Sequence, residues 1–243
     1  MTTTICFDFG NTRLKAAIFA GGEFKKEFFF EKGNTAEINA SLVKYQPQHS
    51  ILSSVIDHDA AIETLLAEKT VFHKLSAATK INFSTSAVDK PETIGADRLA
   101  LCAAAVHFYP GKNNLVIALG TCITYNFINK YSEFTGGAIS PGLEMRLKSL
   151  NHYTAQLPVI KADANVPLIG YDTNTNIGSG VILGMAYEID GFIDEYARKF
   201  DNFNVVLTGG DIVHLASHLK NKIFADPELI FKGLYAISQV NNP

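Results

Sequence analysis

The chain has 243 residues, of which 47% are hydrophobic and 19% are charged, a composition typical of a globular protein with a sizeable buried core. It carries 21 Lys and Arg residues against 24 Asp and Glu residues, and the net charge of −3 excludes the general attraction to nucleic acids and anionic membranes that a basic protein has. No apolar run reaches the ~18 residues of a membrane span, and the start MTTTICFDFG does not have the features of a signal peptide. We therefore expect a cytoplasmic protein that binds neither nucleic acid nor membrane, with its three separated cysteines as buried free thiols.

The first predicted feature is a β-hairpin. Two apolar, strand-like runs, Ile5–Phe9 and Leu14–Phe19, flank the polar turn Gly10-Asn11-Thr12. Gly10 allows a tight backbone path, so a bulky anion can approach the turn closely. Asn11 and Thr12 add short side chains that can donate hydrogen bonds there.

Two charged residues of this hairpin leave two interpretations open. Asp8 lies in an apolar strand, where an acid is costly unless a partner compensates its charge, and Lys15 follows the turn. In one interpretation the turn and Lys15 bind the phosphates of a nucleotide, and Asp8 binds Mg²⁺ or its waters. In the other, this is an ordinary surface hairpin whose turn is capped by Asp8.

The rest of the first half is predicted from apolar runs and from residues that break them. We expect strands at residues 23–31, 49–55 and 71–75. Helices are expected at 34–45, from Asp57 to about residue 69, and at 96–108, where Pro110-Gly111 follows. Residues 76–94 are polar and contain Pro91, which predicts a loop.

The second half repeats the order of the first. Strands are expected at 115–119, 123–128, 133–139 and 205–207, and Gly120 follows its strand as Gly10 follows the first one. Helices are expected after Pro141-Gly142, at 178–200, after a cap at Asp211, and at 228–239, with 158–176 irregular. This repeated order predicts a duplicated α/β fold with domains at 1–111 and 112–243.

A candidate catalytic group lies at Gly95-Ala96-Asp97-Arg98, where a loop meets a helix. Asp97 can accept a proton from an alcohol, and Arg98 can bind a substrate carboxylate through two hydrogen bonds. The alternative is structural, with Asp97 stabilising the positive end of the helix and Arg98 solvated.

Three further segments are rich in glycine, at residues 119–121, 136–142 and 208–211. The first corresponds to the turn of the opening hairpin, and the second can present a helix N-terminus to phosphate. In the third, Gly209 and Gly210 would let a nucleotide base lie on the backbone. Each of these segments can also be a plain turn that binds nothing.

Taken in order, these motifs resemble those of type III pantothenate kinase. They are DFGNTRLK at 8–15, GADR at 95–98, LGT at 119–121, GGAISPG at 136–142 and TGGD at 208–211. The resemblance runs from residue 4 to about residue 211. It implies the fold of the actin, Hsp70 and sugar kinase superfamily, with two RNase H-like halves and ATP in the cleft between them. It also implies ATP-dependent phosphorylation of pantothenate to 4'-phosphopantothenate, the first step of coenzyme A biosynthesis, by a homodimer with its substrate pocket near the subunit interface.

The same resemblance assigns roles to individual residues. Asp97 is the expected proton acceptor, and Asp8 is the expected residue for Mg²⁺. The expected contacts to ATP are Asp8, Gly10, Asn11, Thr12, Lys15 and Thr121, and the expected contacts to pantothenate are Gly95, Ala96, Asp97, Arg98 and Thr173, with Thr175 as the alternative to Thr173.

This chain departs from the family pattern at three positions. Ala118 replaces an Asp that binds a monovalent cation, Asn126 replaces another Asp, and Val88 replaces a Tyr. A requirement for K⁺ or NH₄⁺ is therefore left open, and the pantothenate pocket can differ. Two alternatives follow: a catalytically impaired relative that acts as a regulatory or nucleotide-binding protein, and a kinase for another small hydroxy compound.

Overall fold

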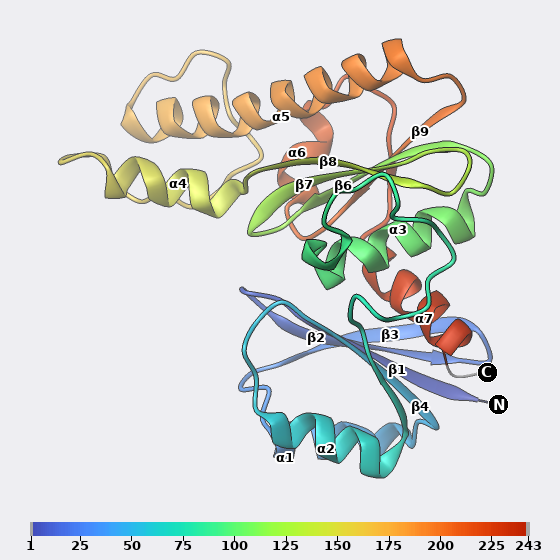
Figure 1. Cartoon of the computed structure of the whole chain (residues 1–243). Coiled ribbons are helices and arrows are strands. Elements are labelled where there is room, and N and C mark those ends of the chain that lie inside the picture. Colours follow the sequence, from blue (N-terminus) through green and yellow to red (C-terminus); the bar gives the residue numbers. More distant parts are fainter. Residues whose placement is uncertain (1, 242–243) are drawn as a thin grey trace. The chain divides into compact units, whose positions relative to one another are not determined.

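The structure is a computed structural model that describes residues 2–241, and these residues form two compact units (Figure 1). The first unit comprises the chain up to Gly111, the short segment Ser132–Thr135, and the chain from Glu228 onward. The second comprises Lys112–Tyr131 and Gly136–Pro227. Each unit is described by itself below.

The first unit contains a five-stranded sheet in the order β3-β2-β1-β4-β5. Its strands are β1 (Thr3–Phe9), β2 (Leu14–Ala20), β3 (Glu23–Phe30), β4 (His49–Ser54) and β5 (Val71–Lys74). Strands β1 and β2 form the predicted antiparallel hairpin, with Asp8 paired to Lys15 across it. Strand β4 runs parallel to β1 and pairs Ser53 with Asp8.

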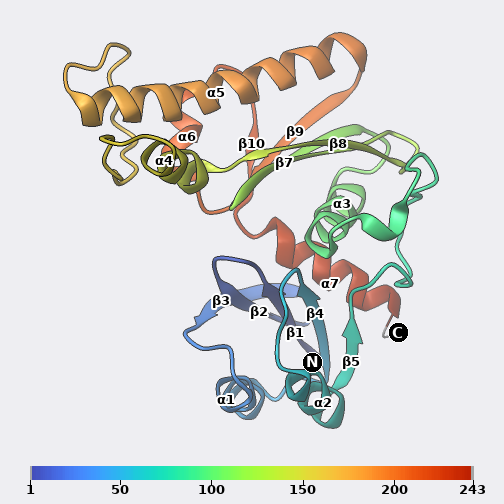
Figure 2. The same cartoon turned by 60° about the vertical axis from the view of Figure 1, so that its left-hand side comes forward.

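Helices cover both faces of this sheet. Helices α1 (Thr35–Tyr45) and α2 (Ala60–Lys69) lie together on one face, and α3 (Ala96–Phe108) and α7 (Leu229–Asn241) lie on the other (Figures 1 and 2). The core beneath α1 and α2 is built from alternate strand residues and apolar helix residues: Ile5, Phe7, Phe9, Ile38, Leu52 and Leu66. A single 3₁₀ turn, η1 (Pro91–Thr93), interrupts the predicted loop before α3.

Two expectations about these helices need correction. The cap of α2 is Asp59 and not Asp57, because the Asp59 side chain accepts a hydrogen bond from the Ala61 amide. Helix α7 lies at the end of the chain but packs in the first unit, whereas the sequence-based division assigned residues 112–243 to one domain. A β-carbon at Gly233 of α7 would collide with the Ala100 carbonyl of α3, so the two helices approach closely at that point.

The second unit repeats the sheet of the first. Its strand order is β10-β9-β6-β7-β8, formed by β6 (Asn113–Leu119), β7 (Cys122–Ile128), β8 (Phe134–Pro141), β9 (Phe203–Thr208) and β10 (Phe224–Ala225). As in the first sheet, the central strand pairs antiparallel with the strand that follows it and parallel with a later one. The predicted duplicated α/β architecture is confirmed by this equivalence.

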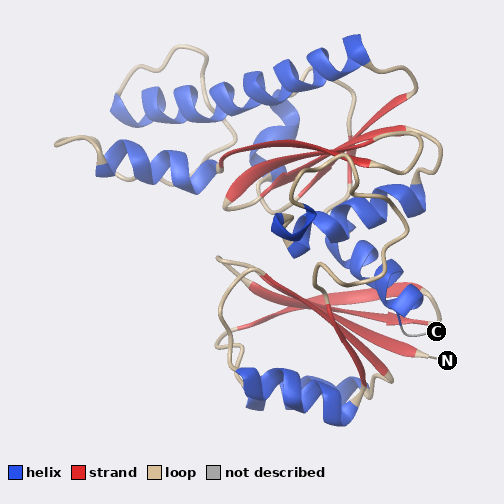
Figure 3. Ribbon diagram, viewed as in Figure 1, coloured by secondary structure: helices blue, strands red, loops and turns tan. Residues whose placement is uncertain are grey.

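The apolar core of the second unit lies under helices α4 (Leu143–His152), α5 (Thr173–Lys199) and α6 (Ile212–Leu215), the last followed by the 3₁₀ turn η2 (Ala216–His218) (Figure 3). Helix α5 begins five residues before the predicted start at Gly178, because Asp172 and Thr175 form a reciprocal capping box. Helix α6 is a single turn, and Asp211 at its start makes no side-chain capping bond. No helix within residues 2–241 combines the length and apolarity needed to cross a bilayer.

Candidate active site

Asp8 and Lys15 form an ion pair at the end of the opening hairpin. Their side chains are 14% and 25% exposed, and Lys15 Nζ lies 3.3 Å from Asp8 Oδ2. Burial raises the pKa of Asp8, the ammonium of Lys15 works against that rise, and the negative charge of Asp97 adds to it. The two acids singled out in the sequence therefore lie close enough to repel each other.

Asp97 lies in the first turn of α3, where Gly95 occupies the N-cap position. Burial raises the pKa of Asp97, and hydrogen bonds from the backbone amides of Arg98 and Asp97 itself oppose this. A β-carbon at Gly95 would lie only 2.5 Å from Asp97 Oδ1, so the missing side chain leaves the space that the carboxylate occupies. Gly95 therefore allows Asp97 to take this position.

Two cations of the predicted site, Lys15 and Arg98, lie over aromatic rings. Lys15 Nζ lies 5.3 Å from the centre of the Phe231 ring on α7, and the Arg98 guanidinium carbon lies 5.4 Å from the centre of the Phe134 ring. Phe231 and Phe134 are both buried. Neither ring was identified from the sequence, because each is more than 30 residues from the charge that it contacts and no local pattern links them.

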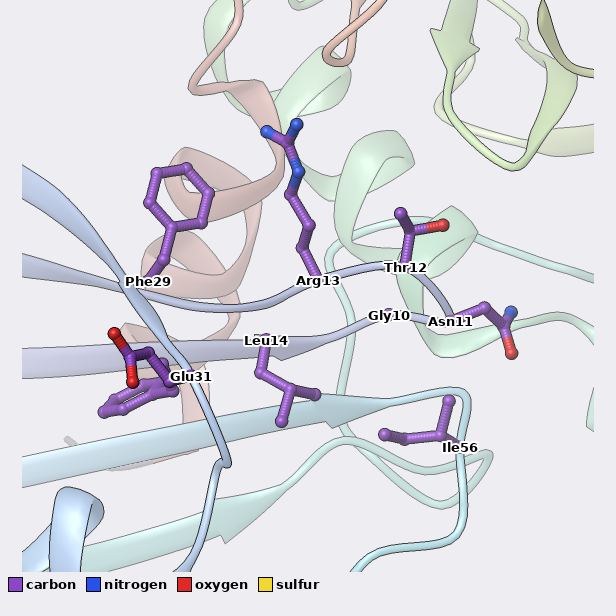
Figure 4. A pocket seen from close by; sticks show the side chains of 9 residues that line it. Gly10, Asn11, Thr12, Arg13, Leu14, Phe29, Glu31 and Ile56 are labelled. Carbon is purple, nitrogen blue, oxygen red and sulfur yellow. The ribbon is translucent and has the colours of Figure 1, made fainter. Parts of the chain in front are cut away.

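The predicted phosphate turn lines a pocket of about 520 Å³. The Gly10 amide donates to the Arg13 carbonyl at 3.1 Å, which closes the turn and leaves Asn11 and Thr12 exposed. Arg13 and Phe29 project to one side of the hairpin, and Leu14 and Ile56 lie on the other (Figure 4). The turn thus offers polar groups to an open cavity that apolar side chains such as Phe29 and Leu14 also line.

In the second unit, three glycine segments that are up to 90 residues apart meet at one corner. A β-carbon at Gly142 would collide with the Gly120 carbonyl, and one at Gly209 would collide with the Leu119 carbonyl. The Gly142 amide donates to the Thr121 carbonyl at 3.1 Å, and Thr121 is exposed at this corner. The positive φ of 104° at Gly209 is also one that few other residues adopt.

Thr173 lies in the first turn of α5 and lines a second pocket, of about 660 Å³, together with residues such as Arg146 and Asn176. Thr175, the alternative, uses its hydroxyl in the capping box, where it bonds to the Tyr171 and Asp172 amides and to the Asp172 side chain. The exposed Thr173 hydroxyl is therefore the better placed of the two to meet a ligand.

Two of the three departures from the family pattern, Ala118 and Asn126, belong to the second unit, and Val88 belongs to the first. Ala118 lies in β6 between Thr124 and Thr208 of the neighbouring strands. Asn126 is fully buried, and its side-chain amide donates to the Val116 carbonyl and to the Thr124 hydroxyl. Val88 belongs to the loop before α3, where its amide donates to the Thr85 carbonyl.

The predicted site residues thus form two groups. The first unit brings together the hairpin and the start of α3, which carry Asp8, Gly10, Asn11, Thr12, Lys15, Gly95, Ala96, Asp97 and Arg98. The second unit carries Thr121, Gly209 and Gly210 at its glycine corner, and Thr173 at the start of α5.

Comparisons with known proteins identify the family. The family model described as type III pantothenate kinase matches residues 4–195. The chain is 40% identical to the type III pantothenate kinase of Flavobacterium johnsoniae over 93% of each protein, and 40% identical to that of Christiangramia forsetii over 98% of each.

Solved structures show the fold. The chain matches a conserved Campylobacter jejuni protein titled as a Baf family transcriptional activator with a TM-score of 0.62 and 22% identity, over 98% of each chain. It matches glucokinase from an Antarctic psychrotroph with a TM-score of 0.50 and 10% identity, over 99% of each. The fold is that of the actin-like ATPases and sugar kinases, and the chain belongs to the type III pantothenate kinase family.

Proposed function

We propose that this protein transfers the γ-phosphoryl group of ATP to the hydroxyl of pantothenate, forming 4'-phosphopantothenate and ADP in the first step of coenzyme A biosynthesis. The observation that carries the proposal is the grouping of Asp8, Lys15 and Asp97 in the first unit of a chain that belongs to this family. The cytoplasm, where ATP is abundant, is the proposed location.

Asp97 is the proposed proton acceptor. The pantothenate hydroxyl oxygen forms a bond to the γ-phosphorus, the bond from that phosphorus to the bridging oxygen of ADP breaks, and the hydroxyl proton passes to Asp97. An ordinary Asp is a weak base, with a pKa of about 3.9. Burial raises the pKa of Asp97, which makes its carboxylate a better base while the nearby helix amides keep it ionisable.

Asp8 is the proposed residue for Mg²⁺. No cluster of three or more His, Cys, Asp or Glu side chains suited to a metal occurs within residues 2–241. One or two carboxylates do suit Mg²⁺, which keeps several waters and takes its other ligands from the nucleotide phosphates. When bound, Mg²⁺ neutralises charge on those phosphates. Asp8 would hold the ion, and Lys15 with the side-chain donors of Asn11 and Thr12 would contact phosphate oxygens.

The second unit supplies the other proposed contacts. Thr121, Gly209 and Gly210 are assigned to ATP, because the two glycines carry no side chain at this corner and because Thr121 and Gly210 are exposed. Thr173 is assigned to pantothenate together with Gly95, Ala96 and Arg98, with the Arg98 guanidinium as the partner of the pantothenate carboxylate. A monovalent cation is not part of the proposal, because Ala118 lacks the side-chain carboxylate that binds it in the family pattern.

We also propose that the protein works as a homodimer. Large apolar side chains are exposed in the second unit, on α4, directly after it and on the segment before α5, namely Met145, Tyr153, Leu168, Ile169 and Tyr171. Exposed apolar groups of this number commonly mark a protein interface. Sedimentation velocity of the wild-type chain and of a Tyr171→Asp variant tests this: we expect a dimer that the variant weakens, and a monomeric wild type would overturn it.

The enzymatic proposal is tested by mass spectrometry of the products. Incubation with ATP, Mg²⁺ and pantothenate should give one ADP for each 4'-phosphopantothenate, whereas a panel of other small hydroxy compounds should give ADP only at the background rate. Turnover with another acceptor but none with pantothenate would assign a different substrate. Nucleotide binding without any turnover would favour the regulatory alternative. None of the contacts described above for Val88, Ala118 and Asn126 indicates such a role.

A further inference from the structure

Ser53 carries a buried hydroxyl that has no assigned role. It lies in β4, its residue is fully buried, and its Oγ has no hydrogen-bond partner among residues 2–241. A buried polar group without a partner is unfavourable and is rare in proteins, so each one calls for a physical explanation.

The sheet register places this hydroxyl next to the proposed metal site. Asp8 of β1 pairs with Lys15 on one side and with Ser53 on the other. Residues that are paired across neighbouring strands direct their side chains to the same face of the sheet. The Asp8 carboxylate is therefore flanked by an ammonium and by a hydroxyl. It forms an ion pair with the ammonium at 3.3 Å, whereas the hydroxyl has no partner among the described residues.

The second unit has a hydroxyl at the equivalent place. Ala118, which corresponds to Asp8, is paired on the parallel strand β9 with Thr208, which corresponds to Ser53. The other buried side-chain atom without a partner among the described residues is Nδ1 of His49. His49 lies at the opposite end of β4 and pairs in register with Thr4. His49 is about 13 Å from Ser53 at about 3.3 Å per residue, so it belongs to a different part of the sheet.

We propose that Ser53 is a positioning residue whose hydroxyl replaces Lys15 as the partner of the Asp8 carboxylate when Mg²⁺ and nucleotide bind. Lys15 then turns to the phosphates, and the Ser53 hydroxyl donates a hydrogen bond to the released carboxylate. That bond compensates part of the buried charge and fixes which oxygen of Asp8 faces the ion. This inference rests on the proposed function, because it assumes that Asp8 serves a Mg²⁺–nucleotide complex.

The test compares Ser53→Ala with Ser50→Ala. Ser50 is also fully buried in β4, but its hydroxyl bonds to the Thr70 hydroxyl at 2.5 Å, and it lies outside the proposed site. Calorimetric titration without pantothenate measures the affinity for Mg²⁺–ATP and, in EDTA, for ATP alone. Ser53→Ala should weaken Mg²⁺–ATP binding by about tenfold, the typical effect of losing a hydrogen bond to a charged group.

Three further results are expected. Ser53→Ala should leave the affinity for metal-free ATP unchanged. It should also leave the Tm of the free protein unchanged or raise it, because it removes a buried hydroxyl that has no partner among the described residues. Ser50→Ala should lower the Tm and leave Mg²⁺–ATP binding unchanged. Ser53→Cys, which keeps a weak donor of similar size, should restore part of the Mg²⁺–ATP affinity.

Equal Mg²⁺–ATP affinity in wild type and Ser53→Ala, or equal weakening by both serine variants, would overturn the proposal. Its failure is separable from failure of the proposed function. If the wild type phosphorylates pantothenate and Ser53→Ala keeps the wild-type Mg²⁺–ATP affinity, only the role of Ser53 is rejected. A wild type that does not phosphorylate pantothenate, but whose Mg²⁺–ATP affinity depends on Ser53, rejects only the acceptor.

Discussion

Gly95 and Asp97 share one corner of helix α3, where a β-carbon on residue 95 would lie 2.5 Å from Oδ1 of Asp97. The atom in conflict is the far end of a flexible side chain, so the fold can absorb an added methyl group by moving the carboxylate. The carboxylate is the proposed base, however, and a displacement of about 1 Å at a reacting group can cost up to about 10²-fold in rate.

We therefore expect Gly95→Ala to lower kcat by at least about tenfold while the Tm changes little. The matched control is Gly191→Ala, at an exposed position of α5 with no atom near the added methyl group. That control should raise the Tm slightly, because Ala is the better helix former, and should keep the wild-type kcat. A Gly95→Ala enzyme with the wild-type kcat would contradict this account of the glycine.

Asp97→Asn should change the pH dependence of stability. Burial raises the pKa of Asp97 in the folded protein above its unfolded value, so the folded protein holds the proton more tightly. The stability that the wild type gains from this is present below the unfolded pKa of about 3.9 and is lost as the pH rises through the folded pKa. The uncharged Asn variant does not suffer this loss.

The Tm of Asp97→Asn should consequently exceed that of wild type by an amount that grows as the pH rises from about 4, then becomes constant above the folded-state pKa. Thermal unfolding of both proteins between pH 4 and pH 8 measures it. A variant that becomes less stable than wild type as the pH rises would show that the ionised carboxylate stabilises the fold.

Cysteine reactivity can report on the second unit. Cys6 and Cys102 are buried, and burial raises the pKa of Cys102 to about 12, so neither thiol should react readily with iodoacetamide in the folded protein. Cys122 is partly exposed and adjoins Thr121. We expect ATP to slow its alkylation, as followed by mass spectrometry of the labelled peptide. Equal labelling with and without saturating ATP would remove Thr121 from the nucleotide site.

The dependence on monovalent cations follows from Ala118 and Asn126. The side chain of Ala118 is a methyl group and that of Asn126 is a neutral amide, where the family pattern has the carboxylates that attract a cation. We expect the rate of ADP release to stay the same when KCl is replaced by choline chloride at constant ionic strength. Activity that appears only with K⁺ or NH₄⁺ would mean that other oxygens form a cation site.

Local sequence patterns were sufficient for most element types. Apolar runs and breakers such as Gly10 and Pro110-Gly111 predicted the hairpin and the bounds of α3, because these elements depend on neighbouring residues. The start of α5 was missed because the capping box of Asp172 and Thr175 lies in a polar stretch that looks irregular.

Long-range packing was not predictable from these patterns. An apolar helix such as α7 can cover either sheet, and its place in the first unit depends on the fit of Gly233 against Ala100. The same holds for the corner formed by Gly120, Gly142 and Gly209, whose segments are distant in sequence. Ser53 gave no signal either, since only the register of β4 places it beside Asp8.

The kcat of Asp97→Asn in pantothenate-dependent ADP release tests the central claim most directly, with Asp89→Asn on the exposed loop as the control. If Asp97 accepts the hydroxyl proton, its variant should lose about 10²-fold or more in kcat and keep a similar KM for ATP, while the control matches wild type. An Asp97→Asn enzyme that turns over at the wild-type rate would contradict the assignment.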